Sequence, residues 1–309
     1  MSTVAETWLV LFLLSAGLGL GACAALGLGR LLEELWLESL FVPLSKMAKL
    51  ALPIALLLAL PMPWLAPHLF PWGAGSDGPG GRALWYNPTF VYLRSLMLIA
   101  LWWVLAWGLS ARGGRGRGGA SLAALVATGA LAMEDWALSR DPGWTGSIQG
   151  LALMTEQLTA ALSLATLLAL HHRKLQGPQE RTGLERALLS VALGVLWLWF
   201  TQFLVVYSAD IPAEASWYLR RSEGAWGVLK LGVALPALLG AVALAIVPQW
   251  QNWRLFLVAS LLLVNHLANL FWTVRPEAAP GAASPLMDAL SLLLMGAALR
   301  AAALRQPRP

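Results

Sequence analysis

Hydrophobic residues in this chain occur in long runs, and most polar residues lie in the segments between the runs. A helix needs about 20 mostly apolar residues to cross about 30 Å of hydrocarbon. Nine runs meet this requirement and predict an all-α polytopic membrane protein, with residues 1–309 forming one integral membrane domain. The predicted spans lie near residues 7–29, 48–66, 90–110, 119–136, 146–170, 187–208, 226–247, 253–273 and 284–304.

The segments between the runs differ in character. Residues 30–46 mix glutamates with leucines, which favours an amphipathic extension at the membrane surface over a tenth span. The Gly/Arg segment 111–119 and the segment 171–186 are predicted to be solvated linkers. Segments 67–89 and 209–225 are longer and rich in Pro, Trp and Tyr, so we expect them to pack against other structure.

Composition supports the membrane assignment. Hydrophobic residues make up 58% of the chain and charged residues only 12%, whereas a soluble domain carries about 25% charged residues. The 17 Trp residues fit the preference of indole rings for the membrane–water interface. The net charge of +5 comes mainly from short loops that meet lipid head groups, so it does not indicate a nucleic-acid partner.

The distribution of basic residues predicts the topology. With the N-terminus outside, 14 of the 21 Lys and Arg residues fall on the inner side and 7 on the outer side. Nine spans with an outer N-terminus and an inner C-terminus satisfy this bias. The residues before the first run include no basic residue, which favours a retained helix over a cleaved signal peptide.

Ionisable groups inside the spans are the strongest functional signal, because each costs at least about 2.5–3.5 kcal/mol in hydrocarbon. Most of these polar residues belong to the outer halves of the spans, and the carboxylate of Glu156 is the deepest. Such a series predicts a proton half-channel that leads from the outer side to Glu156. The candidates are Glu156, His266, Arg94, Gln202, Asp135 and Asp288.

Several of these residues also have a purely structural interpretation. Arg94 and Lys230 could extend their cationic ends to the interface. His266, with Asn265 and Asn269, could form hydrogen bonds between helices instead of relaying protons. Asp135, followed by a Trp, fits an interfacial anchor. Glu156 has no comparable structural explanation.

No motif of a known catalytic or metal site accompanies these residues. The chain has no phosphate-binding Gly loop, no HExxH and no CxxC, and its single cysteine, Cys23, lies in the first run. Only one histidine, His266, lies within a span, whereas haem ligation requires histidines deep in facing spans. We therefore predict no catalytic residue, no metal site and no redox cofactor in this chain.

Four segments within residues 84–275 together match the motifs of one known protein family. Residues 134–144 (EDWALSRDPGW) are similar to the family pattern LDWxMSLDPxW. Residues 200–220 (FTQFLVVYSADIPAEASWYLR) resemble FxQyLLxWYaNxPeExxWYxxR. Residues 266–272 (HLANLFW) are similar to HxxDxxW, and residues 86–90 (YNPTF), which precede Arg94, resemble the start of the corresponding family span.

Through these four segments the chain resembles the F subunit of alternative complex III, with a good match over residues 84–275. The resemblance implies a polysulfide-reductase-like (NrfD) fold, with two four-helix bundles and a flanking C-terminal helix. It also implies a multi-pass subunit of a bacterial inner-membrane complex that oxidises quinol and passes electrons to cytochrome c or an oxidase. Haem c and iron–sulfur clusters would belong to partner subunits, beside a quinol-binding NrfD-like subunit. This chain would have a structural role or a role in proton translocation, and a quinone is a candidate ligand.

The chain departs from the family in three places. It lacks the first of about ten family spans, residues 179–186 lack a His-Asp pair, and Asn269 replaces an Asp. These losses argue against a complete proton path within this chain. In the outer segment, Asp210, Glu214, Trp217, Tyr218 and Arg220 are candidates for docking partner subunits.

Two other functions fit the same sequence. One is a free-standing ion-coupled secondary transporter that uses Glu156, although the spans show no matched pair of broken helices. The other is a structural anchor whose polar residues only bond helices together.

Overall fold

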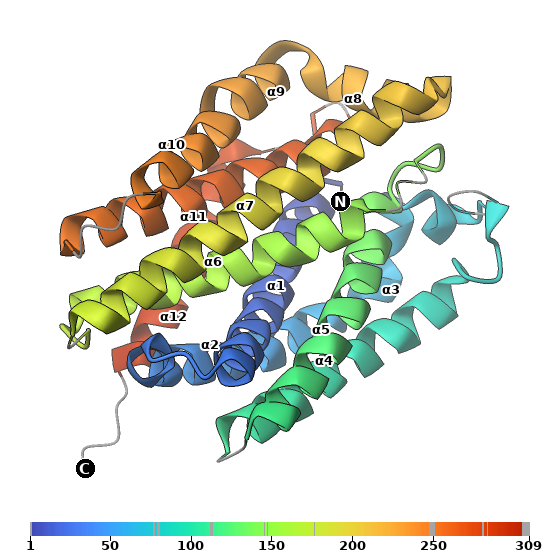
Figure 1. Ribbon diagram of the computed structural model, residues 1–309. Coiled ribbons are helices and arrows are strands. Elements are labelled where there is room, and N and C mark those ends of the chain that lie inside the picture. Colours follow the sequence, from blue (N-terminus) through green and yellow to red (C-terminus); the bar gives the residue numbers. More distant parts are fainter. Residues whose placement is uncertain are drawn as a thin grey trace.

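The computed structural model describes residues 2–304 except 77, 79–80, 112–113, 145, 147, 176, 247–250, 280 and 283, and it describes no side chains at 294–295 and 297–304. Every regular element in the described residues is a helix, and the long helices lie side by side (Figure 1). Eight helices in the described part are long and apolar enough to cross a membrane, which indicates a multi-pass membrane protein.

The long helices account for most of the fold. They are α1 (Ser2–Leu32), α2 (Trp36–Ala59), α4 (Pro88–Ser110), α5 (Arg115–Met133), α6 (Gln149–His171), α7 (Pro178–Ala209), α11 (Asn252–Val274) and α12 (Pro285–Leu304). Shorter α-helices are α3 (Met62–Leu65), α8 (Pro212–Ser222), α9 (Gly224–Val228) and α10 (Leu235–Ala245). Short 3-10 helices are η1 (Ala66–His68), η2 (Pro71–Ala74) and η6 (Arg275–Glu277).

Two helices contain π-helical segments. Segment η4 (Glu134–Leu138) extends α5, and η5 (Leu229–Ala234) joins α9 to α10 in one apolar helix from Gly224 to Ala245. A π-helical turn widens the helix and redirects its side chains, and such turns are frequent at functional sites. Here η4 carries Asp135 and η5 carries Lys230, and each of these charged residues forms hydrogen bonds with a neighbouring helix.

The first eight predicted spans each correspond to one of the eight apolar helices, and the ninth coincides with α12, which is not among the eight. The structure differs most at 30–46 and 171–186. Residues 36–46, predicted as a surface extension, form the first turns of α2, with Trp36 and Leu40 buried. Helix α7 already begins at Pro178, and Glu180 and Glu185 are buried. Burial against neighbouring helices explains why these turns form despite their charged residues.

The helices pack in two groups of four consecutive apolar helices. In the first group α1 packs against α2 and α5, and α4 packs against α2 and α5. In the second group α6 packs against α7 and α11, and the helix that contains η5 and α10 packs against the same two. In both groups, therefore, the first and third helices each pack against the second and fourth. The two groups contact each other through α1 and α6.

The contact between α1 and α6 depends on glycine. A Cβ atom on Gly21 would lie 2.0 Å from the backbone oxygen of Gln157, and a Cβ atom on Gly17 would lie 2.0 Å from its side-chain oxygen. Small residues allow membrane helices to approach closely in this way. The two groups of helices consequently meet backbone to backbone.

Substituting Gly21 should loosen this contact. We expect Gly21→Ala to lower the stability by about 1–3 kcal/mol, because the new methyl group meets the backbone of α6. Gly108→Ala in α4 is the matched control, because a Cβ atom there meets nothing within 4 Å. It should be neutral or stabilising by up to about 1 kcal/mol. Thermal unfolding in detergent measures the stability of both variants. Equal midpoint temperatures for the two variants would contradict a close contact between Gly21 and α6.

A buried network of charges ties four separate segments together at the end of the bundle where α1 begins. Arg140 donates to both carboxylate oxygens of Glu6, and Arg275 donates to Glu6 at 3.1 Å and to Asp288. This end, which we call the N-terminal end, thus brings together the starts of α1 and α12, the segment after η4, and η6. The predicted topology likewise places these four segments on one side of the membrane.

Candidate functional site

Glu156 of α6 lies at the centre of a buried polar cluster in the second group of helices. Its carboxylate Oε1 accepts hydrogen bonds from the indole of Trp199 on α7 and from the amide of Asn269 on α11, the latter at 2.8 Å. The Nδ1 atom of His266 lies 3.9 Å from the other oxygen, Oε2. Only 1% of Glu156 is exposed. Three helices therefore converge on one carboxylate.

The spacing of residues on α11 explains how this helix reaches the cluster. His266, Asn269 and Trp272 follow one another at intervals of three residues, which places them on the same helix face. One residue earlier, Asn265 donates to the backbone oxygen of Ala234 at 2.9 Å, at the end of η5. This bond fixes the π-helical segment against α11.

Lys230 of η5 completes the cluster. Its Nζ atom donates to the side-chain oxygen of Asn269 at 2.6 Å. It also lies 4.2 Å from the ring centroid of Trp199 and 4.3 Å from that of Trp272, a cation–π arrangement. Asn269 therefore bridges the ammonium group of Lys230 and the carboxylate of Glu156. The charge of Lys230 points into the cluster and not to the interface.

The cluster has hydrogen-bonding capacity that the described residues do not use. Neither ring nitrogen of His266 nor Oε2 of Glu156 has a hydrogen-bond partner among them. The distance of 3.9 Å is too long for a direct hydrogen bond but fits one bridged by water or closed by a small movement. A carboxylate and an imidazole that face each other in this way can exchange a proton.

Arg94 and Asp135 form a separate buried pair in the first group of helices. The Nε and Nη2 atoms of Arg94 donate to the two oxygens of Asp135 at 2.6 and 2.7 Å. Trp85 adds a backbone acceptor for Arg94 at 2.7 Å and places its ring 4.1 Å from the guanidinium. Arg94 thus pairs with Asp135 and not with Glu156, and the expected polar path around both residues is divided between two groups of helices.

The two remaining proton-path candidates occupy other places. Asp288 pairs with Arg275 in the charge network at the N-terminal end. Gln202, one turn along α7 from Trp199, accepts from the backbone nitrogen of Ile148 at 3.1 Å. Of the six candidates, the structure thus joins Glu156 with His266 in one cluster and Arg94 with Asp135 in another. Among the described residues, no group of three or more His, Cys, Asp or Glu side chains could hold a metal ion.

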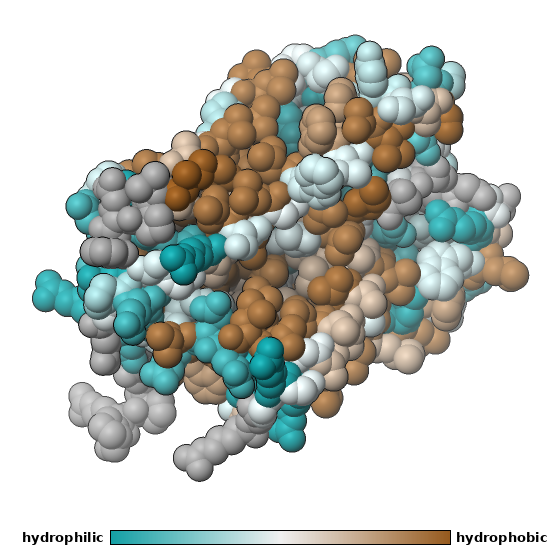
Figure 2. All heavy atoms as spheres, viewed as in Figure 1, coloured by the Kyte–Doolittle hydropathy of each residue, from teal (hydrophilic) through white to brown (hydrophobic). Residues whose placement is uncertain are grey.

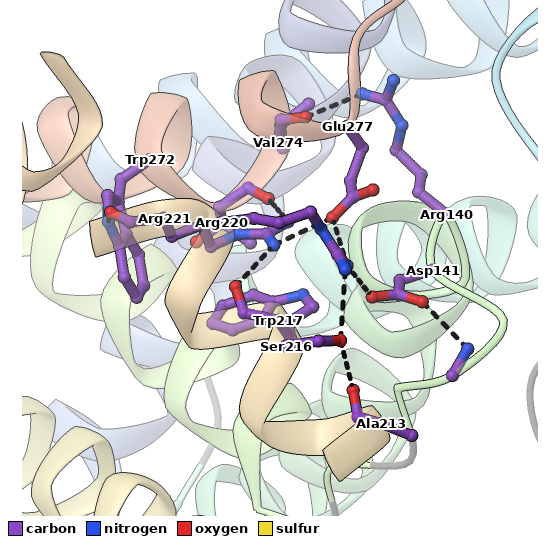
Figure 3. A network of polar contacts seen from close by, with 12 residues as sticks. Arg140, Asp141, Ala213, Ser216, Trp217, Arg220, Arg221, Trp272, Val274 and Glu277 are labelled. Atoms are coloured by element: carbon purple, nitrogen blue, oxygen red, sulfur yellow. Dashed lines mark hydrogen bonds and ion pairs between the residues drawn. The ribbon is translucent and has the colours of Figure 1, made fainter. Parts of the chain in front are cut away.

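The predicted docking residues lie on or beside α8, and the contacts of the inner ones are internal (Figure 3). Trp217 is buried and stacks on Trp144, with their ring centroids 4.5 Å apart. Arg220 pairs with Asp141 and, at 3.3 Å, with Glu277. These contacts attach α8 to the bundle.

The other docking candidates are more accessible. Asp210 is exposed, whereas Glu214 and Tyr218 are partly exposed. Burial raises the pKa of the Tyr218 hydroxyl, although the positive charge of Arg221 opposes the shift. Asp210 is therefore the more accessible of the two acidic docking candidates.

Arg221, next to these residues, is the most buried cation of α8. It donates to the backbone oxygens of Trp217 and Thr273 at 3.1 and 2.8 Å and pairs with Glu277 at 2.8 Å. Burial lowers the pKa of Arg221 to about 10, although Glu277 opposes the shift. The guanidinium therefore remains charged at neutral pH and holds α8 against η6.

Some members of these clusters were not among the predicted site residues. Trp199 looks like one more interfacial Trp in the sequence, yet a buried indole N–H needs an acceptor, and this requirement is the signal that points to it. Lys230 has an alternative interpretation as a residue that reaches the interface. Glu6 and Arg140 lie at the edges of predicted spans, where charges are common.

A comparison of the chain with protein-family models and with curated proteins found no match.

Proposed function

We propose that this chain is a membrane subunit of a bacterial respiratory complex that oxidises quinol, similar to the F subunit of alternative complex III. It would carry no redox centre of its own and would bind and release protons at Glu156. The observation that carries the proposal is the buried cluster in which Glu156 faces His266 and is linked through Asn269 to Lys230. A carboxylate in such a place costs free energy that a purely apolar helix avoids.

Two further observations support the family assignment. The two groups of four helices with the same order of neighbours agree with an NrfD-like pair of four-helix bundles. The segment 266–272, which carries part of the sequence resemblance, supplies His266, Asn269 and Trp272 to the cluster. We therefore place the functional site of the proposed subunit in the second bundle.

The proposed proton route is a half-channel from the N-terminal end. Gln202, Lys230 and Glu156 all lie in the halves of their helices nearest to that end, six or seven residues from the helix terminus. In our proposal the N-terminal end faces the periplasm, and a neighbouring subunit completes the path on the other side. Asp210 and Glu214 would face peripheral subunits.

Co-purification tests membership of such a complex. The tagged chain, expressed in its own host and extracted in mild detergent, should bring down membrane and peripheral partners that contain haem c and iron–sulfur clusters. Absorbance spectra of reduced and oxidised samples detect the haem, and iron analysis detects the clusters. A solitary chain without haem would instead favour a secondary transporter that uses Glu156.

The π-helical segments weigh against that alternative. Transporters built from repeats carry interrupted helices at corresponding places in the two halves. Here η4 belongs to the fourth apolar helix of the first group, and η5 belongs to the third of the second group. The interruptions therefore do not form a matched pair.

A further inference from the structure

A cleft of about 770 Å³ lies beside the Glu156 cluster, between α7, α8, the helix that contains η5, and α11. Its volume is within the range of about 300–1,000 Å³ that is typical of small-molecule sites. Most of its wall is apolar or aromatic, and Trp199 and Trp272 form the part next to Glu156. The cleft therefore has the size and the lining of a binding site.

The cleft lies on the hydrophobic face of the molecule. Its wall includes Phe200, Phe203 and Leu231, which are about half exposed or more. Figure 2 shows a largely hydrophobic surface over α10 and between α10 and α7. In a membrane this surface faces lipid, so a ligand would enter from the hydrocarbon and needs a long apolar part.

Two cations line this apolar cleft, Lys230 and Arg221, and Arg221 is already paired with Glu277 at 2.8 Å. The Nζ atom of Lys230 has three N–H donors, one of which donates to the side-chain oxygen of Asn269 at 2.6 Å. Asp210 also belongs to the cleft lining, but among the described residues no carboxylate oxygen lies within 4.0 Å of the Nζ atom. A cation next to hydrocarbon is stabilised most by an anion in direct contact. The cleft thus combines a hydrophobic channel with a site for an anionic head group.

The depth of Lys230 restricts that head group. Lys230 follows the first residue of its helix, Gly224, by six positions, or about 9 Å at the helical rise. A phospholipid phosphate stays at the level of the helix ends, whereas a single-chain amphiphile can move along the cleft. A carboxylate is compact, and both of its oxygens accept charge-assisted hydrogen bonds from an ammonium group.

We propose that this cleft binds a long-chain carboxylate, with a fatty acid as the ligand class. The carboxylate accepts hydrogen bonds from Lys230, and the acyl chain lies along Phe200, Phe203 and Leu235. This inference goes beyond the proposed respiratory function and does not depend on it. It gives Lys230 a direct role in ligand binding next to the carboxylate of Glu156.

Photolabelling tests the proposal. The purified chain in nanodiscs is irradiated with a palmitate analogue that carries a diazirine on its chain, and adducts are located by mass spectrometry. We expect adducts on α7 and on the helix from Gly224 to Ala245, which excess palmitate suppresses and hexadecanol does not. Lys230→Gln should reduce labelling about tenfold or more, because a charge-assisted hydrogen bond is lost. Lys230→Arg should retain most of it.

A second variant keeps the test decisive if Lys230→Gln fails to fold. Leu235→Trp keeps the charge and fills the cleft, so it should also suppress labelling. Adducts spread equally over α4, equal competition by hexadecanol, or undiminished labelling in a folded Lys230→Gln protein would each overturn the proposal.

Discussion

Glu6→Gln should destabilise the protein by about 3–5 kcal/mol. This is the largest loss of stability that we expect when a single charged side chain is replaced by an uncharged one. Glu6 is only 2% exposed and accepts hydrogen bonds from both Arg140 and Arg275. The amide keeps the size of the side chain but removes its charge. Two buried guanidinium groups would then share the single carboxylate of Asp288, and one positive charge would lack its counterion. Unfolding in detergent, by heat and by denaturant, measures the loss.

An exposed ion pair provides the matched control. Glu33 pairs with Arg115 at 3.9 Å, and their side chains are 69% and 65% exposed. Glu33→Gln should therefore cost about 0–1 kcal/mol. The double variant Glu6→Gln/Arg140→Gln restores the balance of charge and should be more stable than the sum of its single changes predicts. A Glu6→Gln protein as stable as Glu33→Gln would show that the network does not hold this end together.

Hydrophobic runs predicted the membrane helices because a span leaves a long and simple signal. The positions of the first eight predicted spans agree with the eight apolar helices, and disagreements are largest where charged turns extend a helix beyond the hydrocarbon. Trp36 and Glu185 are such cases. A hydropathy scan excludes these turns from a span because they contain charged residues. They are helical because they are buried against neighbouring helices that are distant in sequence.

The site was predicted only in part, for a related reason. A carboxylate within an apolar run is visible in the sequence, and Glu156 was found in this way. Its partners are not visible in the sequence, because His266 and Asn269 lie on a helix about 110 residues away. Any Lys or Arg in the outer half of a span could equally have been the cation near Glu156. Packing of the helices places Lys230 near Glu156, with Asn269 hydrogen-bonded to both, and pairs Arg94 with Asp135.

Glu156→Gln should reduce the number of protons translocated per quinol oxidised if the proposed function is right. Glutamine preserves the size and the acceptor oxygen that Trp199 and Asn269 contact, but it cannot bind and release a proton. Electron transfer should continue, because the proposed redox centres belong to partner subunits. A substitution that merely weakened the fold would lower both quantities together.

The decisive measurement is the ratio of protons to quinol in vesicles that contain the complete purified complex. Glu223→Gln is the control, because Glu223 is exposed at the start of the helix that carries Lys230. We predict that the ratio falls in Glu156→Gln, is unchanged in Glu223→Gln, and that quinol oxidation persists in both. An unchanged ratio in Glu156→Gln would contradict a role of this carboxylate in proton translocation.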